Sequence, residues 1–163
     1  MVNNFSHTES VETLRKALFG ELKNLTFETN NDCVEGTAIG RLVGGNLTLI
    51  YSFGGTMYDL NVKDAILLIE DTGEANYNVD RMLNNLKLSG KLDEIKGVIV
   101  GNFTNSNQGS DKPINQIIHD NFDDLNIPIL YNASIGHSTK NLATYLGRKI
   151  TLNVEGKSAT ITF

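Results

Sequence analysis

The sequence lacks the features that mark exported or membrane-bound proteins. Its single cysteine, Cys33, can form no internal disulfide and has no second thiol for a zinc ribbon or redox pair, which fits a reducing compartment. No apolar run approaches the length needed to cross a bilayer, and the first ten residues lack the basic and apolar regions of a signal peptide. We therefore expect a cytoplasmic protein with no membrane partner.

Positive charge is also scarce. The chain has 14 Lys and Arg against 19 Asp and Glu, a formal net charge of −5, so it offers no basic stripe to neutralise phosphates. We do not expect nucleic acid as a partner. The 163 residues, 40% of them hydrophobic, are enough for one domain with its own core, and we interpret residues 1–163 as a single domain.

Cofactor motifs are missing as well. Glycine pairs at 44–45 and 54–55 match neither the GxGxxG fingerprint nor the Walker pattern for phosphates. The adjacent acids Glu70 and Asp71 could hold Mg²⁺ through carboxylates and water, but no third acid follows the other expected strands. We therefore expect no metal and no cofactor.

The chain does contain short buried strands that alternate with amphipathic helices. This alternation predicts right-handed crossover units and a parallel sheet. Strands are expected over residues 65–70, 97–103 and 127–132, with helices over 76–90 and 113–125 between them. Residues 148–163 alternate on both sides of "EGK" and predict an antiparallel hairpin. The expected fold class is α/β, a mostly parallel sheet with crossover helices closed by a C-terminal β-hairpin.

The N-terminal part is expected to contain a helix, a strand and a second helix. Ser6 and Glu9 form a capping box, and the residues expected on the inner helix face recur at helical spacing: Val11, Leu14, Leu18 and Leu22. The stretch "TAIGRLV" alternates like a strand, and Asn46 is a good cap for a helix over "LTLIYSF".

Polar residues follow each expected parallel strand, where the carboxyl ends of such strands meet at one edge of the sheet. The first strand delivers Glu70 and Asp71, the second Asn102, and the third leads to His137. A carboxylate and an imidazole thus reach one rim from separate strands, the arrangement needed when one group orients the other.

The acids after the first strand also have structural interpretations. Asp71 and Glu74 lie at the start of the next helix, where negative charge is favourable, so we expect them to stabilise that helix. Glu70 points the other way by strand alternation, and it is either functional or a loop anchor.

The three histidines also differ in how well their positions fit a functional role. His137 is either an exposed surface histidine or functional, since it follows a strand end. His7 lies in the capping segment of the first helix and His119 on the expected solvent face of its helix, so both rank lower.

A nucleophile is missing. Ser138 is the next residue after His137, and adjacent side chains usually point in different directions. Ser110 in "QGSD" has no strand-to-helix elbow around it. Cys33 has no recognisable motif. Either the chain is not catalytic, or its nucleophile belongs to another domain.

Several strings together resemble one known family. They are "GRLVGGNLTLI", "IEDTGEANYNVDRML", "GVIVGNF" and "IPILYNASIGH", in that order, and the resemblance runs from "NFS" at residue 4 onward. The chain is similar to the C-terminal half of the LD-carboxypeptidases, the serine peptidase family that includes the microcin C self-immunity peptidase.

The resemblance implies a two-domain enzyme with a Ser-His-Glu triad whose serine lies in an N-terminal domain. It places the triad acid at Glu70 and the base at His137, with Glu70 preferred to Glu74 because it lies at the strand end. Carboxypeptidase members of the family cleave terminal D-alanine from murein tetrapeptides during cytoplasmic cell-wall recycling. Immunity members cleave a peptidyl-nucleotide antibiotic.

The departure from the family is large, because the N-terminal domain with its G-x-S-D serine is absent and "QGSD" does not replace it. The resemblance therefore implies a C-terminal domain that is inactive alone, whose partners are a serine domain of the same parent chain and a murein peptide. Asn46 is a candidate substrate contact, and a homodimer is left open. The alternatives are the corresponding domain of a microcin-type immunity peptidase that cleaves a peptidyl-nucleotide, a noncatalytic ligand-binding module, and a small metal-dependent hydrolase that uses Glu70 and Asp71.

Overall fold

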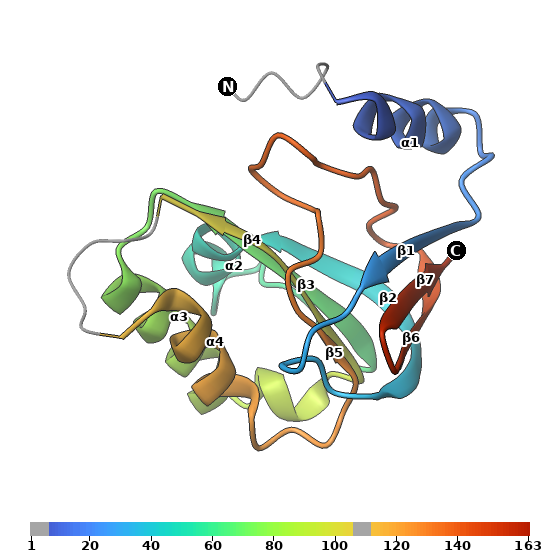
Figure 1. The fold of residues 1–163 in the computed structure, drawn as a ribbon. Helices are drawn as coiled ribbons and strands as arrows, with labels where there is room; N and C mark the ends of the chain where they lie inside the picture. The colour runs from blue at the N-terminus through green and yellow to red at the C-terminus, as the bar shows by residue number, and fades with distance from the viewer. Residues whose placement is uncertain (1–6, 106–111) are drawn as a thin grey trace.

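The computed structural model describes residues 7–105 and 112–163, which form one seven-stranded sheet in the order β1-β7-β6-β2-β3-β4-β5 (Figure 1). The strands are β1 (Asn24–Glu28), β2 (Gly36–Asn46), β3 (Ala65–Thr72), β4 (Gly97–Thr104), β5 (Ile129–Leu130), β6 (Lys149–Glu155) and β7 (Ser158–Thr162). The helices are α1 (Thr8–Leu18), α2 (Leu47–Phe53), α3 (Asn76–Leu88) and α4 (Ile114–Phe122), with a 3₁₀ turn η2 (Lys91–Glu94).

The sheet has a parallel and an antiparallel part. Strands β2, β3, β4 and β5 pair parallel, whereas β6 pairs antiparallel with both β2 and β7. The expected α/β fold class with its closing hairpin is confirmed. One strand adds to it, because β1 pairs antiparallel with β7 and widens the hairpin to three strands.

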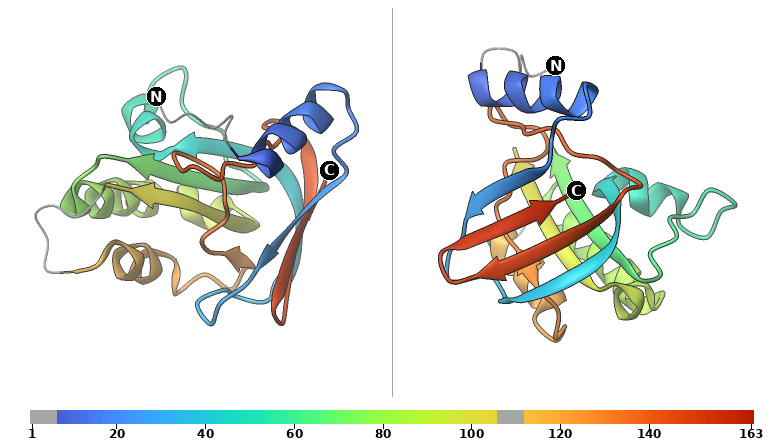
Figure 2. Two further views of the ribbon diagram at one scale, coloured as in Figure 1. Left: turned by 45° about the horizontal axis from the view of Figure 1, so that its top comes forward. Right: turned by 90° about the vertical axis from the view of Figure 1, so that its right-hand side faces the viewer.

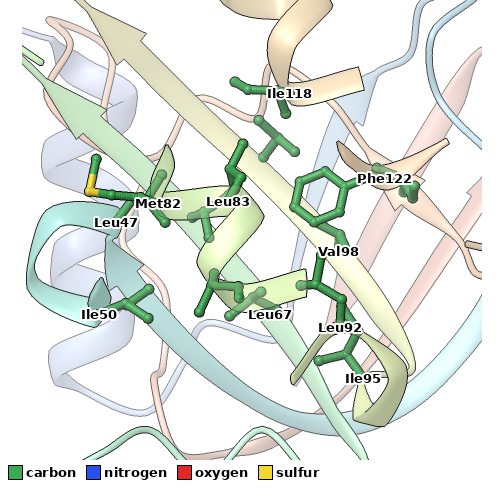
Figure 3. Packing of buried hydrophobic residues seen from close by; sticks show 14 of the residues in the cluster. Leu47, Ile50, Leu67, Met82, Leu83, Leu92, Ile95, Val98, Ile118 and Phe122 are labelled. Carbon is green, nitrogen blue, oxygen red and sulfur yellow. The ribbon is translucent and has the colours of Figure 1, made fainter. Parts of the chain in front are cut away.

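The parallel strands read as continuous apolar runs because both faces of the sheet are covered. Helices α2, α3 and α4 cover one face, and Figure 3 shows their side chains meeting those of the strands. The largest side chains enclosed in this layer are Leu47, Leu67, Ile69, Leu83, Ile118, Phe122 and Ile129. Burial of a side chain of this size contributes about 1.5–3 kcal/mol of transfer free energy.

On the other face of the sheet, no helix of the described residues lies against the parallel strands. The antiparallel strands curl round toward this face, and residues 131–147 run across it with little regular secondary structure (Figure 2). This segment contributes Ala133, Ile135 and Leu142 to a second core with Leu68 and Ile99. The segment also carries His137, so its path decides where that side chain lies.

Helix α1 buries the opposite face from the one that its apolar spacing predicted. Val11, Leu14 and Leu18 are 41%, 39% and 77% exposed, whereas Ser10 and Thr13 are buried. The expected inner face was wrong for these three residues, because α1 packs on the backbone of residues 141–145, whose N–H groups need polar acceptors, and not on the apolar sheet.

Two further differences concern helix starts. His7 is the N-cap of α1 and its side chain makes no capping hydrogen bond, while Ser6 of the expected capping box lies outside the described residues. Pro113 precedes α4 as its N-cap residue and is not its first helical residue. No helix within residues 7–105 or 112–163 combines the length and apolarity that crossing a membrane requires.

Candidate active site

The site is a contact between a buried acid and a half-exposed imidazole. Glu70, near the end of β3, and His137, which follows β5, place Oε2 and Nδ1 2.7 Å apart. The Glu70 side chain is 8% exposed and that of His137 is 50% exposed. The structure thus brings together the two residues that the sequence expected at one edge of the sheet.

The direction of this hydrogen bond follows from the acceptor chemistry of a carboxylate. An ionised carboxylate only accepts, so the ring donates Nδ1–H and its Nε2 is the nitrogen left for a reacting group. Among the described residues the ring makes no other hydrogen bond. Holding one ring nitrogen on a fixed carboxylate orients the imidazole.

Two glycines allow the backbone to approach Glu70 closely. A Cβ atom on Gly136, whose φ is +120°, would lie 2.7 Å from Oε2 and 2.9 Å from Cβ of Glu70. A Cβ on Gly101 of β4 would lie 3.1 Å from the same Cβ atom. Glycine is required where backbone and side chain are this close. The "IGH" string placed Gly136 at the turn beside the histidine, but sequence reasoning predicted the close approach to Glu70 for neither glycine.

Residues of β4 hold the turn that carries the histidine. Ser138 donates its hydroxyl to Oδ1 of Asn102 at 2.6 Å, and Thr104 donates to the carbonyl oxygen of His137 at 3.2 Å. Asn102 therefore lies at the expected edge but contacts Ser138 and supports the turn. Because the Ser138 hydroxyl is directed to Asn102, it is not directed to the imidazole, in agreement with its dismissal as a nucleophile.

Asp71 points to the opposite face of the sheet from Glu70, as strand alternation predicts. Its carboxylate accepts from the Asn46 amide, from the Thr48 backbone N–H and from the Thr48 hydroxyl, each at 2.9 Å. The expectation that Asp71 stabilises the helix after β3 was wrong. It stabilises the first turn of α2, which precedes β3, because the parallel pairing of β2 with β3 brings that turn beside it.

Glu74 and Asn46 also have structural contacts. Glu74 accepts a hydrogen bond from Asn78 at 2.9 Å, and the N-cap of α3 is Ala75, with no side-chain cap. Glu74 therefore does not cap that helix. Asn46 caps α2 as expected, since its Oδ1 accepts from Leu49 N at 3.1 Å. A substrate contact by Asn46 stays a prediction.

The remaining candidates lie away from the pair. The His119 ring stacks on Tyr131 with centroids 5.7 Å apart, so it is less free in solvent than its helix position suggested. Burial raises the pKa of the Tyr131 hydroxyl. Cys33 is half-buried and its sulfur contacts Asn30 and the Tyr131 backbone.

A cavity of about 460 Å³ opens beside the pair. Its walls include Glu70 and His137 together with apolar side chains of β3 and of the 131–147 segment, namely Leu68, Ile135, Leu142 and Leu146. A small, mostly apolar hollow with a few polar groups is typical of a substrate site. Within residues 7–105 and 112–163, no group of three or more His, Cys, Asp or Glu residues could hold a metal ion.

Comparison with known sequences gives a consistent picture. The family model described as "LD-carboxypeptidase C-terminal domain" matches residues 39–152. The chain is 34% identical to a probable murein peptide carboxypeptidase of Bacillus subtilis over 94% of this chain and 51% of that protein. It is 33% identical to a putative carboxypeptidase of Synechocystis over 90% of this chain and 50% of that one. The chain thus spans about half the length of these curated relatives.

Solved structures share the fold. A muramoyltetrapeptide carboxypeptidase from Oxalobacter formigenes aligns with a TM-score of 0.84 at 23% identity, over 95% of this chain and 54% of that one. The microcin C7 self-immunity protein MccF aligns with a TM-score of 0.76 at 21% identity, over 96% of this chain and 56% of that one. Both cover nearly all of this chain and little more than half of the solved protein.

Proposed function

This chain belongs to the LD-carboxypeptidase family through its C-terminal domain, and we propose that it supplies the histidine and the glutamate of a Ser-His-Glu triad. The observation that carries the proposal is the 2.7 Å contact between Oε2 of Glu70 and Nδ1 of His137 beside an open cavity. The proposed reaction is the release of terminal D-alanine from murein tetrapeptides, in keeping with the name of the Bacillus relative.

The proposed steps follow from the two ring nitrogens. Nε2 of His137 takes the proton of a serine hydroxyl as the serine oxygen attacks the carbonyl carbon of the terminal peptide bond. The same nitrogen then gives that proton to the amine of D-alanine as the C–N bond breaks. Nε2 then takes a proton from water as the water oxygen attacks the acyl carbon, and it returns that proton to the serine oxygen as the ester bond breaks. Glu70 stays ionised, holds Nδ1–H and stabilises the imidazolium in both steps.

The buried position of Glu70 suits this role. A carboxylate that is 8% exposed is poorly screened by water, so its attraction for an imidazolium 2.7 Å away is stronger than at a surface. The Gly136 backbone lies so close to the carboxylate that a Cβ there would be 2.7 Å from Oε2, and this close packing limits the movement of the carboxylate before the reaction starts. Such preorganised charge lowers the barrier because little rearrangement is needed in the transition state.

We propose that the serine comes from an N-terminal domain of the same parent chain. Ser138 donates its hydroxyl to Asn102, and Ser110 of "QGSD" lies outside the described residues. We therefore propose that the 163-residue chain is inactive alone. We also propose that the reaction takes place in the cytoplasm. A homodimer stays a prediction.

A peptidyl-nucleotide substrate is the competing proposal within the family. The likeness to MccF, at 21% identity, concerns the fold alone. A substrate comparison decides between the two. The parent enzyme is expected to release D-alanine from a murein tetrapeptide and to leave a peptidyl-nucleotide intact.

The triad assignment is tested by substitution in the full-length parent enzyme. We expect His137→Ala and Glu70→Gln each to lower kcat by about 10³–10⁴-fold, since triad members act as a unit, with unchanged circular dichroism. Glu74→Gln is the matched control, because Glu74 is the neighbouring acid that contacts Asn78 and not the imidazole. A loss of activity in Glu74→Gln with full activity in Glu70→Gln would reverse the assignment.

A further inference from the structure

The position of His137 depends on side-chain contacts more than on secondary structure. Residues 131–147 contain no helix, and Gly136 forms a single isolated β-bridge, with Asn102. The carbonyl side of the turn is attached to β4, since Asn102 N donates to the Ile135 carbonyl at 2.9 Å and Thr104 donates to the His137 carbonyl. The N–H of Gly136, on the other side, needs a separate partner.

Asn141 is that partner. Its Oδ1 accepts the Gly136 N–H at 3.0 Å and so closes a short loop that contains His137. The same Gly136 is pressed against Glu70, where a Cβ would lie 2.7 Å from Oε2. A shift of the Gly136 backbone would therefore move the imidazole and its partner carboxylate apart.

Helix α1 in turn fixes Asn141. The Asn141 N–H donates to the Ser10 hydroxyl at 2.9 Å, and Ser10 is 5% exposed. The next contact repeats the pattern, since the Ala143 N–H donates to the Thr13 hydroxyl at 3.2 Å. In Figures 1 and 2 the helix lies beside the segment that carries these residues.

These contacts explain why α1 buries polar residues and exposes apolar ones. Lys140 forms an ion pair with Glu9 at 2.7 Å, and the Tyr145 hydroxyl donates to the Ala17 carbonyl at 2.9 Å. Residues 9, 10, 13 and 17 of α1 thus contact residues 140, 141, 143 and 145 in the same order. A buried, hydrogen-bonded contact of this kind specifies one conformation, because a shifted register would leave buried donors without acceptors.

We propose that Asn141 is a positioning residue that holds His137 against Glu70, and that Ser10 of α1 holds Asn141 in place. Asn141 acts through Gly136 and exchanges no proton in the reaction. The catalytic consequence rests on the proposed function, whereas the effect on the imidazole is a property of this chain alone.

The geometric part is tested by ¹⁵N NMR of the histidine rings in the 163-residue chain, at a pH where His137 is neutral. Wild-type His137 is expected to carry its proton on Nδ1, since that nitrogen donates to Glu70. Asn141→Ala is expected to give a mixture in which the Nε2–H tautomer, preferred by free histidine, is present. Asn141→Asp keeps the acceptor for Gly136 N–H and is expected to retain the wild-type tautomer.

Asn121→Ala is the matched control. Asn121 is a buried amide that donates to the Ile117 carbonyl at 2.9 Å on α4, so its loss destabilises the fold without touching the site. An unchanged tautomer in Asn141→Ala, or an equal change in Asn121→Ala, would overturn the proposal. If Asn141→Ala does not fold, Ser10→Ala serves instead and is expected to change the tautomer in the same direction.

The catalytic part is tested in the full-length parent enzyme. Asn141→Ala is expected to lower kcat by about 10–100-fold with little change in KM, because misplacement of a catalytic group affects the chemical step. Asn141→Asp is expected to recover most of the loss. A parent enzyme without peptidase activity would contradict the proposed function and leave the NMR result standing. An active parent whose kcat does not respond to Asn141→Ala would contradict the positioning role alone.

Discussion

Glu70 and Asp71 are neighbours with different roles because successive side chains of a strand point to opposite faces. Glu70 faces the segment that carries His137, and Asp71 faces the first turn of α2. The direction of each side chain could be predicted from the strand pattern. The partner of Asp71 could not, since Thr48 lies 23 residues earlier and is brought near by the pairing of β2 with β3.

The role of Gly136 gives a prediction at this scale. Gly136→Ala would place a Cβ 2.7 Å from Oε2 of Glu70 in a backbone conformation with φ of +120°, so we expect a loss of about 2–4 kcal/mol in the free energy of unfolding. Urea denaturation measures this loss. NMR of the His137 ring is expected to show that the contact with Glu70 is broken.

Gly147→Ala separates backbone strain from crowding. Gly147 also has a positive φ, of +82°, but an added Cβ there meets nothing within 4 Å. We expect a loss of about 1 kcal/mol and an unchanged His137 signal. Equal effects of the two substitutions on stability and on the ring would show that close packing on Glu70 is unimportant.

At the scale of elements, the predictions succeeded where burial decides the structure. The apolar runs of β3 and β4 and the periodicity of α3 depend on a sheet covered on both faces, and that pattern is visible in the sequence. Residues 131–147 have no such periodicity, since their path is set by hydrogen bonds to residues far away in the chain. The contact of Ser10 with Asn141 spans 131 residues.

The predicted buried face of α1 was wrong for a related reason. Its apolar spacing is real, but the surface available to it is a polar backbone segment, so the hydroxyls of Ser10 and Thr13 face inward. Hydrophobic periodicity predicts that a helix forms. The inference that its apolar side faces inward holds only when the surface it packs on is apolar. That condition does not hold when the partner surface is a loop.

The loop after α2 gives a prediction that depends on pH. The Gly55 N–H and the Lys91 ammonium hold the pKa of the Asp59 carboxyl below its ordinary value of 3.8. A lowered pKa in the folded state stabilises the protein fully above the unfolded value, and this stabilisation is lost as the pH falls through the folded value. Asp59→Asn is therefore expected to cost about 0.5–1 kcal/mol at pH 7 and to cost less below pH 3.8.

Urea denaturation of both proteins between pH 7 and pH 3 measures this difference. Asp124→Asn is a suitable comparison, because Asp124 pairs with Lys87 at 3.1 Å but is 82% exposed. Exposed pairs contribute little, so this variant is expected to match the wild type throughout. A cost of Asp59→Asn that stays constant or grows toward pH 3 would contradict the assigned contacts.

At the scale of the whole molecule, the two faces of the sheet differ in what they carry. One face carries α2, α3 and α4 and most of the large buried side chains, and the other carries the segment that holds His137 over Glu70 (Figure 2). The site lies where the parallel strands end, which is the edge that the sequence predicted. The family was predicted from sequence strings, whereas the glycines around Glu70 and the support from α1 depend on three-dimensional packing that no local pattern records.

The central claim is that this chain holds an oriented base but requires a serine from elsewhere in its parent protein. The most direct test is the release of D-alanine from a murein tetrapeptide, measured for the 163-residue chain and for the full-length parent at equal concentration. We predict release by the parent, none above background by the chain alone, and none by the parent with His137→Ala. Turnover by the isolated chain at the rate of the parent, or undiminished release after His137→Ala, would contradict the account.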